Sequence, residues 1–545
     1  MKNKNIIILS PIVIALAIIA GVFIGMNFHT KQPANNRFII YPRADKLNSV
    51  LNFVEEDYVD TVDKDDLVET AIPQILKELD PHSMYIPASD FNKVNEPLEG
   101  NFSGIGVQFN MQNDTVAIIN TTRKGPSEKV GILPGDRIIT VDGDTVAGKG
   151  MPSDSIVSKL KGPQGTVVTV GIDRRGENEL LFFDITRDRI PLTSVDVSYM
   201  INDSVGYIKI SRFSRTTFDE FLAHGQSLLS QGMKKIILDL RDNNGGYMEQ
   251  ATNIADQFLT EGKLIVYTQG RSRPRSSVYA TSNGILLDTE VVVIVNEYSA
   301  SASEIVAGAI QDNDRGTIVG RRTFGKGLVQ EPRMFRDGSA MRLTVARYYT
   351  PTGRSIQKPY DNGAEDYYND LHKRFAQGEF LEQDSIYFAD SLKFTTPKGK
   401  IVYGGGGIMP DVFVPLDTTD VTDYYIRVRN NSLIYRYAFD YTDGNRELLA
   451  AFNDYKALQK YLEQKNVYRD FVRYASNKGV PASGKDIRES KEIINIQLQA
   501  YISRNIFDNE GFYPIIKDID HTLQEALKAF DYEPLTVPLE ELAEQ

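Results

Sequence analysis

Cysteine is absent from all 545 residues, and only five histidines occur. The missing thiols exclude a disulfide framework and a thiolate zinc site. The net charge is -12 at pH 7, and no stripe of Lys and Arg is visible. Because phosphate binding needs clustered positive charge, the sequence argues against a nucleic-acid partner. What is present is a globular composition, 41% hydrophobic and 25% charged, in a chain long enough for several domains.

The N-terminus carries a targeting pattern. Lys2 and Lys4 precede an uncharged, mostly aliphatic stretch at residues 6–28, which is long enough to cross a bilayer as a helix. A cleaved signal peptide is the alternative, but its usual small-residue cleavage site is poorly matched. We therefore expect residues 1–30 to be a single-pass anchor in the cytoplasmic membrane, or a secretion signal if they are cleaved. The rest of the chain then lies outside the cytoplasm, in the periplasm.

Four further segments follow from the apolar pattern and the turns. Residues 37–98 are expected to be a helical region, since residues 45–79 show helical periodicity. Short strand-like runs alternate with turn signals over residues 99–187. Strands alternate with helical runs over 188–420, which predicts a mostly parallel sheet with crossover helices. Residues 421–545 have helical spacing and few glycines, and are expected to form a separate helical domain.

A serine-rich stretch, NEYSASASEIVAGA at residues 296–309, stands where an apolar run ends and a helical run begins. Ser301 and Glu304 fit a capping box, in which a hydroxyl and a carboxylate satisfy backbone N–H groups at a helix start. The alternative role for Ser301 is that of a nucleophile. Both roles can hold together, so the choice depends on a base and an oxyanion site elsewhere in the chain.

Serine needs a base to remove its proton. None of the five histidines lies in a glycine-rich or strand-end context, and His82, beside a proline, is typical of a turn or packing residue. Lysine can replace histidine when burial lowers its pKa. Lys326 is our candidate, because Gly325 and Gly327 permit close packing around it. Gln330 falls on the same side of an extended strand and could hydrogen-bond the amine.

Two other interpretations of these motifs fail. Residues 320–326 nearly spell a phosphate-binding loop, but Gly327 stands where a Ser or Thr should hold magnesium, and a strand-like run follows where a helix is needed. The Ser-x-x-Lys motif of penicillin-binding enzymes occurs at residues 158–161 and 355–358, without its companion motifs.

An acyl-transfer site also needs hydrogen-bond donors for the developing oxyanion. The sequence predicts one at the backbone N–H of Ala302, at the head of a helix whose dipole favours negative charge. A second is expected from Gly245 or Gly246, where the run IILDLRDNNGG leaves a strand. The sequence does not distinguish between these two glycines.

Residues 101–187 resemble a PDZ domain, a module that adds an extended peptide to the edge of its sheet. The similarity rests on FSGIGVQF, from residue 102, and on KGPSEKVGILPGDRIITVDG, from residue 124. Glycines at 104 and 106 allow backbone N–H groups to face a carboxylate. The expected peptide-binding loop consists of Phe102, Ser103, Gly104, Ile105, Gly106 and Val107.

Seven segments together resemble the carboxyl-terminal processing peptidases, also called tail-specific proteases. They are, in order, LDPHSMYI, FSGIGVQF, LDLRDNNGG, NEYSASASEIVAGAIQD, TFGKGLVQ, YYTPTGRSIQ and GGGIMPDVFVP, within residues 45–418. The resemblance implies a multidomain α/β protein. Its parts are a protease core of the ClpP/crotonase type, an inserted PDZ domain, an N-terminal helical segment and a C-terminal helical domain.

The resemblance also implies the chemistry of a serine endopeptidase. The family's nucleophile falls on Ser301, its general base on Lys326 and its supporting glutamine on Gln330, with no metal or organic cofactor. Many relatives read Asn-Pro-Gly-Gly where this chain has Asn244 in place of the proline, which makes the turn before the glycines less rigid. A buried amine as base predicts activity that rises from neutral to alkaline pH.

The implied substrates are extracytoplasmic proteins or peptides with apolar C-termini, recruited or gated by the PDZ domain. The helical ends could mediate a homodimer, and an adaptor could activate the enzyme. The alternative function is a catalytically inactive adaptor that binds protein C-termini through its PDZ domain.

Overall fold

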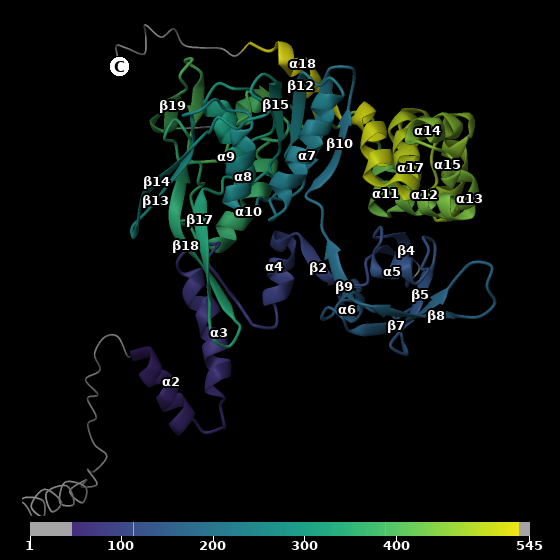
Figure 1. Ribbon diagram of the computed structural model, residues 1–545, viewed down its shortest axis with the longest axis horizontal. Helices are drawn as coiled ribbons and strands as arrows, with labels where there is room; N and C mark the ends of the chain where they lie inside the picture. Colours follow the sequence, from purple (N-terminus) through teal and green to yellow (C-terminus); the bar gives the residue numbers. More distant parts are fainter. Residues whose placement is uncertain (1–45, 113, 387–388, 534–545) are drawn as a thin grey trace, which may run out of the picture. The chain divides into compact units, whose positions relative to one another are not determined.

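A computed structural model describes residues 46–112, 114–386 and 389–533 (Figure 1). The anchor predicted at residues 1–30 lies outside the described residues. Within those described ranges, no helix is both long and apolar enough to cross a membrane. The described residues divide into two compact units, one ending at residue 72 and the other beginning at residue 73.

The first unit contains α2 (Lys46–Asp57) and the beginning of α3 (Lys64–Lys77). The expected helical N-terminal segment is thus confirmed, with an interruption between the two helices. Leu47, Val50 and Phe53 of α2 are all more than half exposed. Their spacing of three residues places them on one side of the helix.

The strand-rich part of the second unit is built around one antiparallel sheet. Its strand order is β3 (Val107–Gln112), β4 (Thr115–Thr121), β5 (Arg137–Val141), β7 (Val167–Asp173) and β8 (Leu181–Thr186), and β6 (Asp144–Thr145) pairs with β5. Helices α5 (Pro126–Lys129) and α6 (Ser153–Leu160) accompany it, and Ile156 of α6 packs into its core. Strand β3 stands at an edge of this sheet. An edge strand can accept a further strand from a bound peptide.

The largest sheet has the order β10-β11-β12-β15-β16-β21. Its strands are β10 (Val195–Met200), β11 (Val205–Ile210), β12 (Lys235–Asp239), β15 (Glu290–Val295), β16 (Thr317–Gly320) and β21 (Val412–Phe413). Only the pair β10–β11 is antiparallel. The predicted mostly parallel sheet is therefore confirmed.

Alternate residues of its central strands face two separate hydrophobic cores. Ile236 and Leu238 of β12 contribute to a core shared with α7 (Thr217–Ser230), α8 (Met248–Asp256) and α9 (Ala302–Asp312). Ile237, between them, packs in a core with α18 (His521–Lys528). Burial on both faces explains why β12 and β15 read as continuous aliphatic runs.

A second, antiparallel sheet has the order β1-β18-β13-β14, and β17 also pairs with β18. These strands are β1 (Met84–Ile86), β13 (Leu264–Gly270), β14 (Arg273–Tyr279), β17 (Leu328–Met334) and β18 (Ala340–Tyr349). Short elements flank the two sheets: α4 (Phe91–Glu99), the pair β2 (Asn101–Gly104) and β9 (Asp188–Pro191), α10 (Ala364–Ala376), and the pair β19 (Lys393–Thr395) and β20 (Ile401–Tyr403).

The C-terminal helices do not all belong to one core. The helices from α11 (Asp423–Asn430) to α17 (Lys491–Ile516) enclose a core of their own, with α12 (Leu433–Gly444), α13 (Arg446–Ala450), α14 (Tyr455–Gln464), α15 (Val467–Asn477) and α16 (Gly484–Glu489) between them. Leu523 and Ala526 of α18 pack against the parallel sheet instead. The end of the described chain thus completes the second face of that sheet, whereas the sequence suggested a wholly separate helical domain.

Candidate active site

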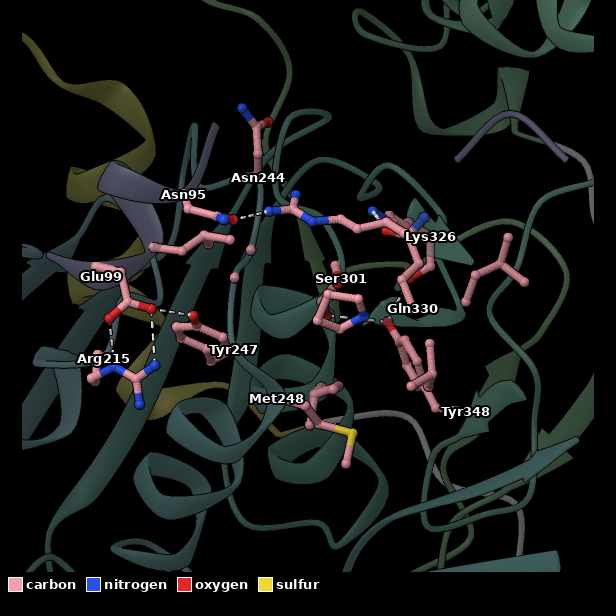
Figure 2. Close-up of a pocket in the computed structure, with 18 of the residues that line it drawn as sticks. Asn95, Glu99, Arg215, Asn244, Tyr247, Met248, Ser301, Lys326, Gln330 and Tyr348 are labelled. Carbon is pink, nitrogen blue, oxygen red and sulfur yellow. Dashed lines mark hydrogen bonds and ion pairs between the residues drawn. The ribbon is translucent and has the colours of Figure 1, made fainter. Parts of the chain in front are cut away.

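Three loops meet at the carboxyl edge of the parallel sheet, the edge at which open α/β sheets usually bind ligands. They follow β12, β15 and β16, and they carry the expected oxyanion glycines, Ser301 and Lys326, respectively. Beside them lies a cavity of about 710 Å³, also lined by α4, β17 and β18 (Figure 2). Ser301, Lys326, Gln330, Gly245 and Gly246 all line this cavity.

Ser301 is the N-cap residue of α9 and has a strained backbone, with φ 56° and ψ -111°. Such a conformation costs a non-glycine residue about 1–3 kcal/mol and is characteristic of functional sites. The carboxylate of Glu304 accepts a hydrogen bond from the Ser301 N–H (2.8 Å), as the capping box predicts. The capping hydrogen bond helps to hold the serine in this strained conformation at the start of the helix.

Lys326 stands just before β17, with its amine directed to Gln330. Lys326 Nζ donates to Gln330 Oε1 at 3.3 Å, and the Gln330 amide donates in turn to the carbonyl of His82. Burial lowers the pKa of Lys326, and the nearby positive charge of Arg342 lowers it further. A lysine with a lowered pKa can be neutral near physiological pH, as a general base requires.

Glycine is required on both sides of this lysine. A Cβ on Gly325, where φ is 87°, would come within 3.1 Å of the Gly407 nitrogen. A Cβ on Gly327 would lie 3.0 Å from the backbone nitrogen of Gln357. The close packing expected around Lys326 is therefore backbone against backbone.

Glu304 joins the serine loop to the lysine loop. Its fully buried carboxyl group accepts hydrogen bonds from the N–H groups of Ser301 (2.8 Å), Gly325 (2.7 Å) and Lys326 (2.9 Å), and from Thr323 Oγ1 (2.5 Å). Burial raises its pKa to about 7, although these four donors act in the opposite direction. The sequence marked Glu304 as a cap, but only the folded chain reveals its second set of partners.

Tyr348 of β18 lines the cavity and contacts both the serine loop and the lysine loop. Its buried hydroxyl lies 3.1 Å from the Ser301 carbonyl oxygen and 2.7 Å from the Lys326 carbonyl oxygen. Among the described side chains, Ser301 and Lys326 themselves share no hydrogen bond. Catalytic hydrogen bonds are often long or poorly aligned before substrate binds, so this arrangement is compatible with a serine–lysine pair.

The two glycines expected to form the oxyanion site differ in how their N–H groups are used. Gly245 N–H donates to Asn243 Oδ1 (2.9 Å). The N–H groups of Gly246 and Ala302 have no acceptor within the described part of the chain. A Cβ on Gly245 would lie 3.0 Å from the Ala302 nitrogen, so the glycine turn packs directly on the start of α9. Unpaired N–H groups beside a serine are the donors that an oxyanion needs.

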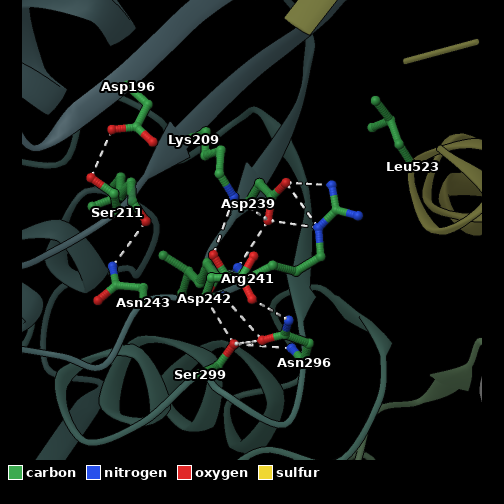
Figure 3. A network of polar contacts seen from close by, with 12 residues as sticks. Asp196, Lys209, Ser211, Asp239, Arg241, Asp242, Asn243, Asn296, Ser299 and Leu523 are labelled. Atoms are coloured by element: carbon green, nitrogen blue, oxygen red, sulfur yellow. Dashed lines mark hydrogen bonds and ion pairs between the residues drawn. The ribbon is translucent and has the colours of Figure 1, made fainter. Parts of the chain in front are cut away.

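A polar network fixes the glycine turn, despite the missing proline (Figure 3). The Asn243 carbonyl accepts from Ala300 N–H (3.0 Å) and Ser303 Oγ (2.8 Å), and the Asn243 amide donates to the Ile210 carbonyl (2.9 Å). Asn243 is completely buried. These hydrogen bonds make the turn rigid, although it has Asn244 where many relatives have a proline.

Charged residues anchor the strand end before that turn. Arg241 pairs with Asp239 (2.6 Å) and with Asp520 at the start of α18 (2.6 Å). Burial alone would raise the pKa of Asp239, but the charges of Arg241 and Lys209 lower it. A buried carboxylate compensated in this way resists displacement, because removing either partner would leave an unpaired buried charge.

His82 has a larger role than the sequence indicated. Its carbonyl accepts the hydrogen bond from Gln330, and its Nε2 lies 2.8 Å from the Tyr367 hydroxyl. Burial and the charge of Lys326 lower the pKa of His82 to about 4, so the ring is neutral. Asp80 accepts from the His82 and Ser83 N–H groups (both 2.8 Å) and fixes the turn. His82 therefore helps to position Gln330. Its sequence position beside a proline gave no sign of this role.

The expected peptide-binding loop at residues 102–107 is largely strand: residues 102–104 belong to β2, residue 107 begins the edge strand β3, and only Ile105 and Gly106 connect them. Gly106 has φ 73°, and a Cβ there would meet Ile190 Cδ1 at 2.9 Å, so glycine is needed. Gly104 does not adopt a left-handed conformation, because it pairs with Asp188 in the β2–β9 ladder. The left-handed turn is therefore made at Gly106 alone, whereas Gly104 lies in a strand.

Comparison with known proteins assigns the parts of the chain. Peptidase family S41 matches residues 204–365, a PDZ domain matches residues 103–184, and a family of unknown function matches residues 424–508. A carboxy-terminal-processing protease of Bartonella bacilliformis is 35% identical over 347 residues, which cover 62% of this chain and 79% of that protein. A probable CtpA-like serine protease of Staphylococcus aureus is 34% identical over 57% of this chain and 62% of its own length.

Among solved structures, a photosystem II D1 C-terminal processing protease is 29% identical, covers 57% of this chain and 89% of its own, and has a TM-score of 0.33. The extent of the match to the Bartonella protein is sufficient to define the family. The chain belongs to the carboxy-terminal processing proteases of peptidase family S41, which are serine peptidases.

Proposed function

We propose that this serine peptidase cuts extracytoplasmic proteins near their C-termini by an acyl-enzyme mechanism, with Ser301 as nucleophile and Lys326 as base. One observation carries the proposal: a strained serine and a partly buried lysine line one cavity and are tied to each other through the carboxyl group of Glu304. A hydroxyl that merely capped a helix would need no lysine of lowered pKa in the same cavity.

In the first step, the neutral amine of Lys326 accepts the proton of Ser301 Oγ as the oxygen attacks the peptide carbonyl carbon. The carbonyl oxygen becomes an oxyanion and receives hydrogen bonds from Ala302 N–H and, by our assignment, Gly246 N–H. The free N–H of Gly246 supports this choice over Gly245, whose N–H is already used by Asn243. Gln330 holds the amine in position.

In the second step, the tetrahedral intermediate collapses, and the carbon–nitrogen bond breaks. The Lys326 ammonium returns its proton to the leaving amine, and the acyl group remains on Ser301. Water then attacks the ester, with Lys326 again accepting a proton, and a new C-terminal carboxylate leaves. The cycle consumes one water and restores both residues.

Finer expectations on location and partners belong to the same proposal. Residues 6–28 would anchor the chain in the cytoplasmic membrane with the peptidase on the periplasmic side. The loop at 102–107 and the edge of β3 would recruit substrates by their apolar C-terminal residues. The exposed apolar side of α2 is our candidate for a homodimer contact. Fractionation of cells, peptide titration of residues 99–187 and mass measurement in solution test these three points.

The catalytic assignment is tested with an unfolded protein that ends in an apolar tail. We expect the wild type to release a C-terminal fragment, and Ser301→Ala and Lys326→Ala to release it at least a thousandfold more slowly. Ser158→Ala is the matched control, because its hydroxyl bonds only to the Asp154 carbonyl. Intact-mass spectrometry should detect the acyl-enzyme. Equal cleavage by the wild type and both active-site variants would instead support the inactive adaptor.

A further inference from the structure

Two arginines line the active-site cavity, and they differ in their hydrogen-bond partners. Arg215 forms two hydrogen bonds with Glu99, at 2.8 and 2.9 Å, and Tyr247 donates a third bond to the same carboxylate (Figure 2). Arg342 of β18 donates only to the amide oxygen of Asn95, at 2.8 Å. No Asp or Glu within the described ranges forms an ion pair with Arg342.

The cavity cannot neutralise Arg342 by itself. Glu99 is the one acidic side chain among the described residues that line it, and this carboxylate is taken by Arg215. Burial lowers the pKa of Arg342, which reflects the loss of water around its guanidinium group. A partly buried charge without a partner is costly, so such a group usually awaits a ligand of opposite charge. The planar guanidinium group matches a carboxylate with two parallel hydrogen bonds.

The position of Arg342 fixes where such a carboxylate would lie. In the β17–β18 ladder, Arg342 is opposite Pro332, and Gln330 is opposite Thr344. Arg342 is therefore two residues along the ladder from the glutamine that holds the catalytic amine. An extended peptide advances about 3.3 Å per residue, so its carboxylate would reach Arg342 about two to four residues beyond the cleaved bond.

The surroundings of Arg342 also suit an apolar tail. Pro332 and Met334 of β17, Phe91 and Leu98 of α4, and Leu328 and Val329 line the same cavity. A short apolar segment ending in a negative charge would place its side chains on this surface and its charge on Arg342.

On these grounds, and given the proposed function, we propose that Arg342 binds a carboxylate of the substrate on the leaving-group side of the cleaved bond. The C-terminal α-carboxylate of a short tail is the first source of this group, and an acidic side chain at the same distance is the second. The peptidase would then read the end of the chain in the catalytic cavity itself, independently of the PDZ domain.

The test uses fluorogenic peptides of one sequence with tails of two to eight residues. Each tail ends in a free acid, in a carboxamide, or in a carboxamide preceded by Asp. We compare kcat/KM for acid and amide at a single pH, because Arg342→Gln also removes a charge that lowers the pKa of Lys326 and changes both rates together. The ratio of the two values cancels that effect.

We expect the wild type to prefer the acid by roughly 10- to 100-fold for tails of about two to four residues. Arg342→Gln should reduce the preference to about threefold or less, and Arg342→Lys should retain part of it. Arg215→Lys is the matched control and should keep the wild-type ratio, because it retains a positive charge beside Glu99. If the Asp-containing amide is favoured in an Arg342-dependent way, the side chain can also supply the carboxylate.

Two results would overturn the proposal: no acid preference in the wild type, or a full preference that persists in Arg342→Gln. A binding measurement distinguishes failure of this proposal from failure of the catalytic assignment to Ser301. In a Ser301→Ala background, fluorescence anisotropy of the labelled peptides gives the same acid-to-amide ratio without turnover. A ratio that depends on Arg342 in binding supports the carboxylate site even if Ser301 is not the nucleophile.

Discussion

Replacing Glu304 with Gln tests whether one buried carboxyl group holds the serine and lysine loops together. All four of its hydrogen-bond partners are donors: three backbone N–H groups, and the hydroxyl of Thr323. A glutamine side chain offers one oxygen and turns an NH2 group toward the remaining donors. Two donors then lose their acceptor in a site that excludes water.

The expected magnitude follows from these contacts. A buried donor left without an acceptor costs about 1–3 kcal/mol, so Glu304→Gln should destabilise the start of α9 by roughly 2–6 kcal/mol. The same change should displace Ser301 and Lys326 and lower kcat more than it alters KM, because both groups act in the transition state of the proposed mechanism.

The loss of stability caused by Glu304→Gln should depend on pH. The pKa of Glu304 in the folded protein, about 7, lies above its ordinary 4.5, so the protonated carboxyl group is the form that folding favours. This contribution is complete below pH 4.5 and is lost as the pH rises through 7, which amounts to roughly 3 kcal/mol. Glutamine does not titrate, so the stability gap between wild type and variant should narrow by that amount between pH 5 and pH 8.

Hydrogen exchange of peptides from residues 302–312, followed by mass spectrometry and corrected for intrinsic rates, measures this local stability directly. A local probe is needed because a multidomain chain does not unfold in one step. Thr323→Val is the control, since it removes one donor but leaves a titrating carboxyl group. A gap that stays constant or widens from pH 5 to pH 8 would show that burial does not control the ionisation of Glu304.

Three further predictions concern the same site. Activity of the wild type should rise with pH as Lys326 loses its proton, and the rise should occur below the usual pKa range of a lysine because the pKa of Lys326 is lowered. Lys326→Arg stays protonated and should be inactive at every pH in the same series. Gly246→Ala should reduce kcat at least 100-fold and lower the melting temperature, because its Cβ would lie 2.1 Å from the Phe213 carbonyl oxygen; normal kinetics and stability would contradict that packing. Tyr348→Phe should lower the local stability of the start of α9 by about 1–3 kcal/mol, measured by the same hydrogen exchange, since two carbonyl oxygens lose the one hydroxyl donor that they share, and Tyr349→Phe serves as its control.

Several features of this protein could be predicted from residues close together in the chain. The aliphatic runs of β12 and β15 predicted buried parallel strands, because each side of such a strand needs apolar residues. The spacing of Ser301 and Glu304 predicted the cap at the start of α9. Glycines on both sides of Lys326 predicted close backbone packing there. In each case the physical requirement acts over a few neighbouring residues, so the sequence displays it.

Other features arise only when distant segments meet. The second set of Glu304 partners lies about twenty residues away, and the carbonyl that supports Gln330 belongs to His82, 248 residues earlier. The rigidity of the glycine turn comes from contacts of Asn243 with residues 210, 300 and 303, so the absent proline was a misleading guide. Arg342 is another example, because a sequence does not show which arginines form ion pairs in the folded protein. Sequence by itself determined which groups we propose for the chemistry, since that choice depends on residue type and local spacing. The tertiary structure alone decided which charges are paired, buried or left free, since burial and electrostatic compensation depend on neighbours in space.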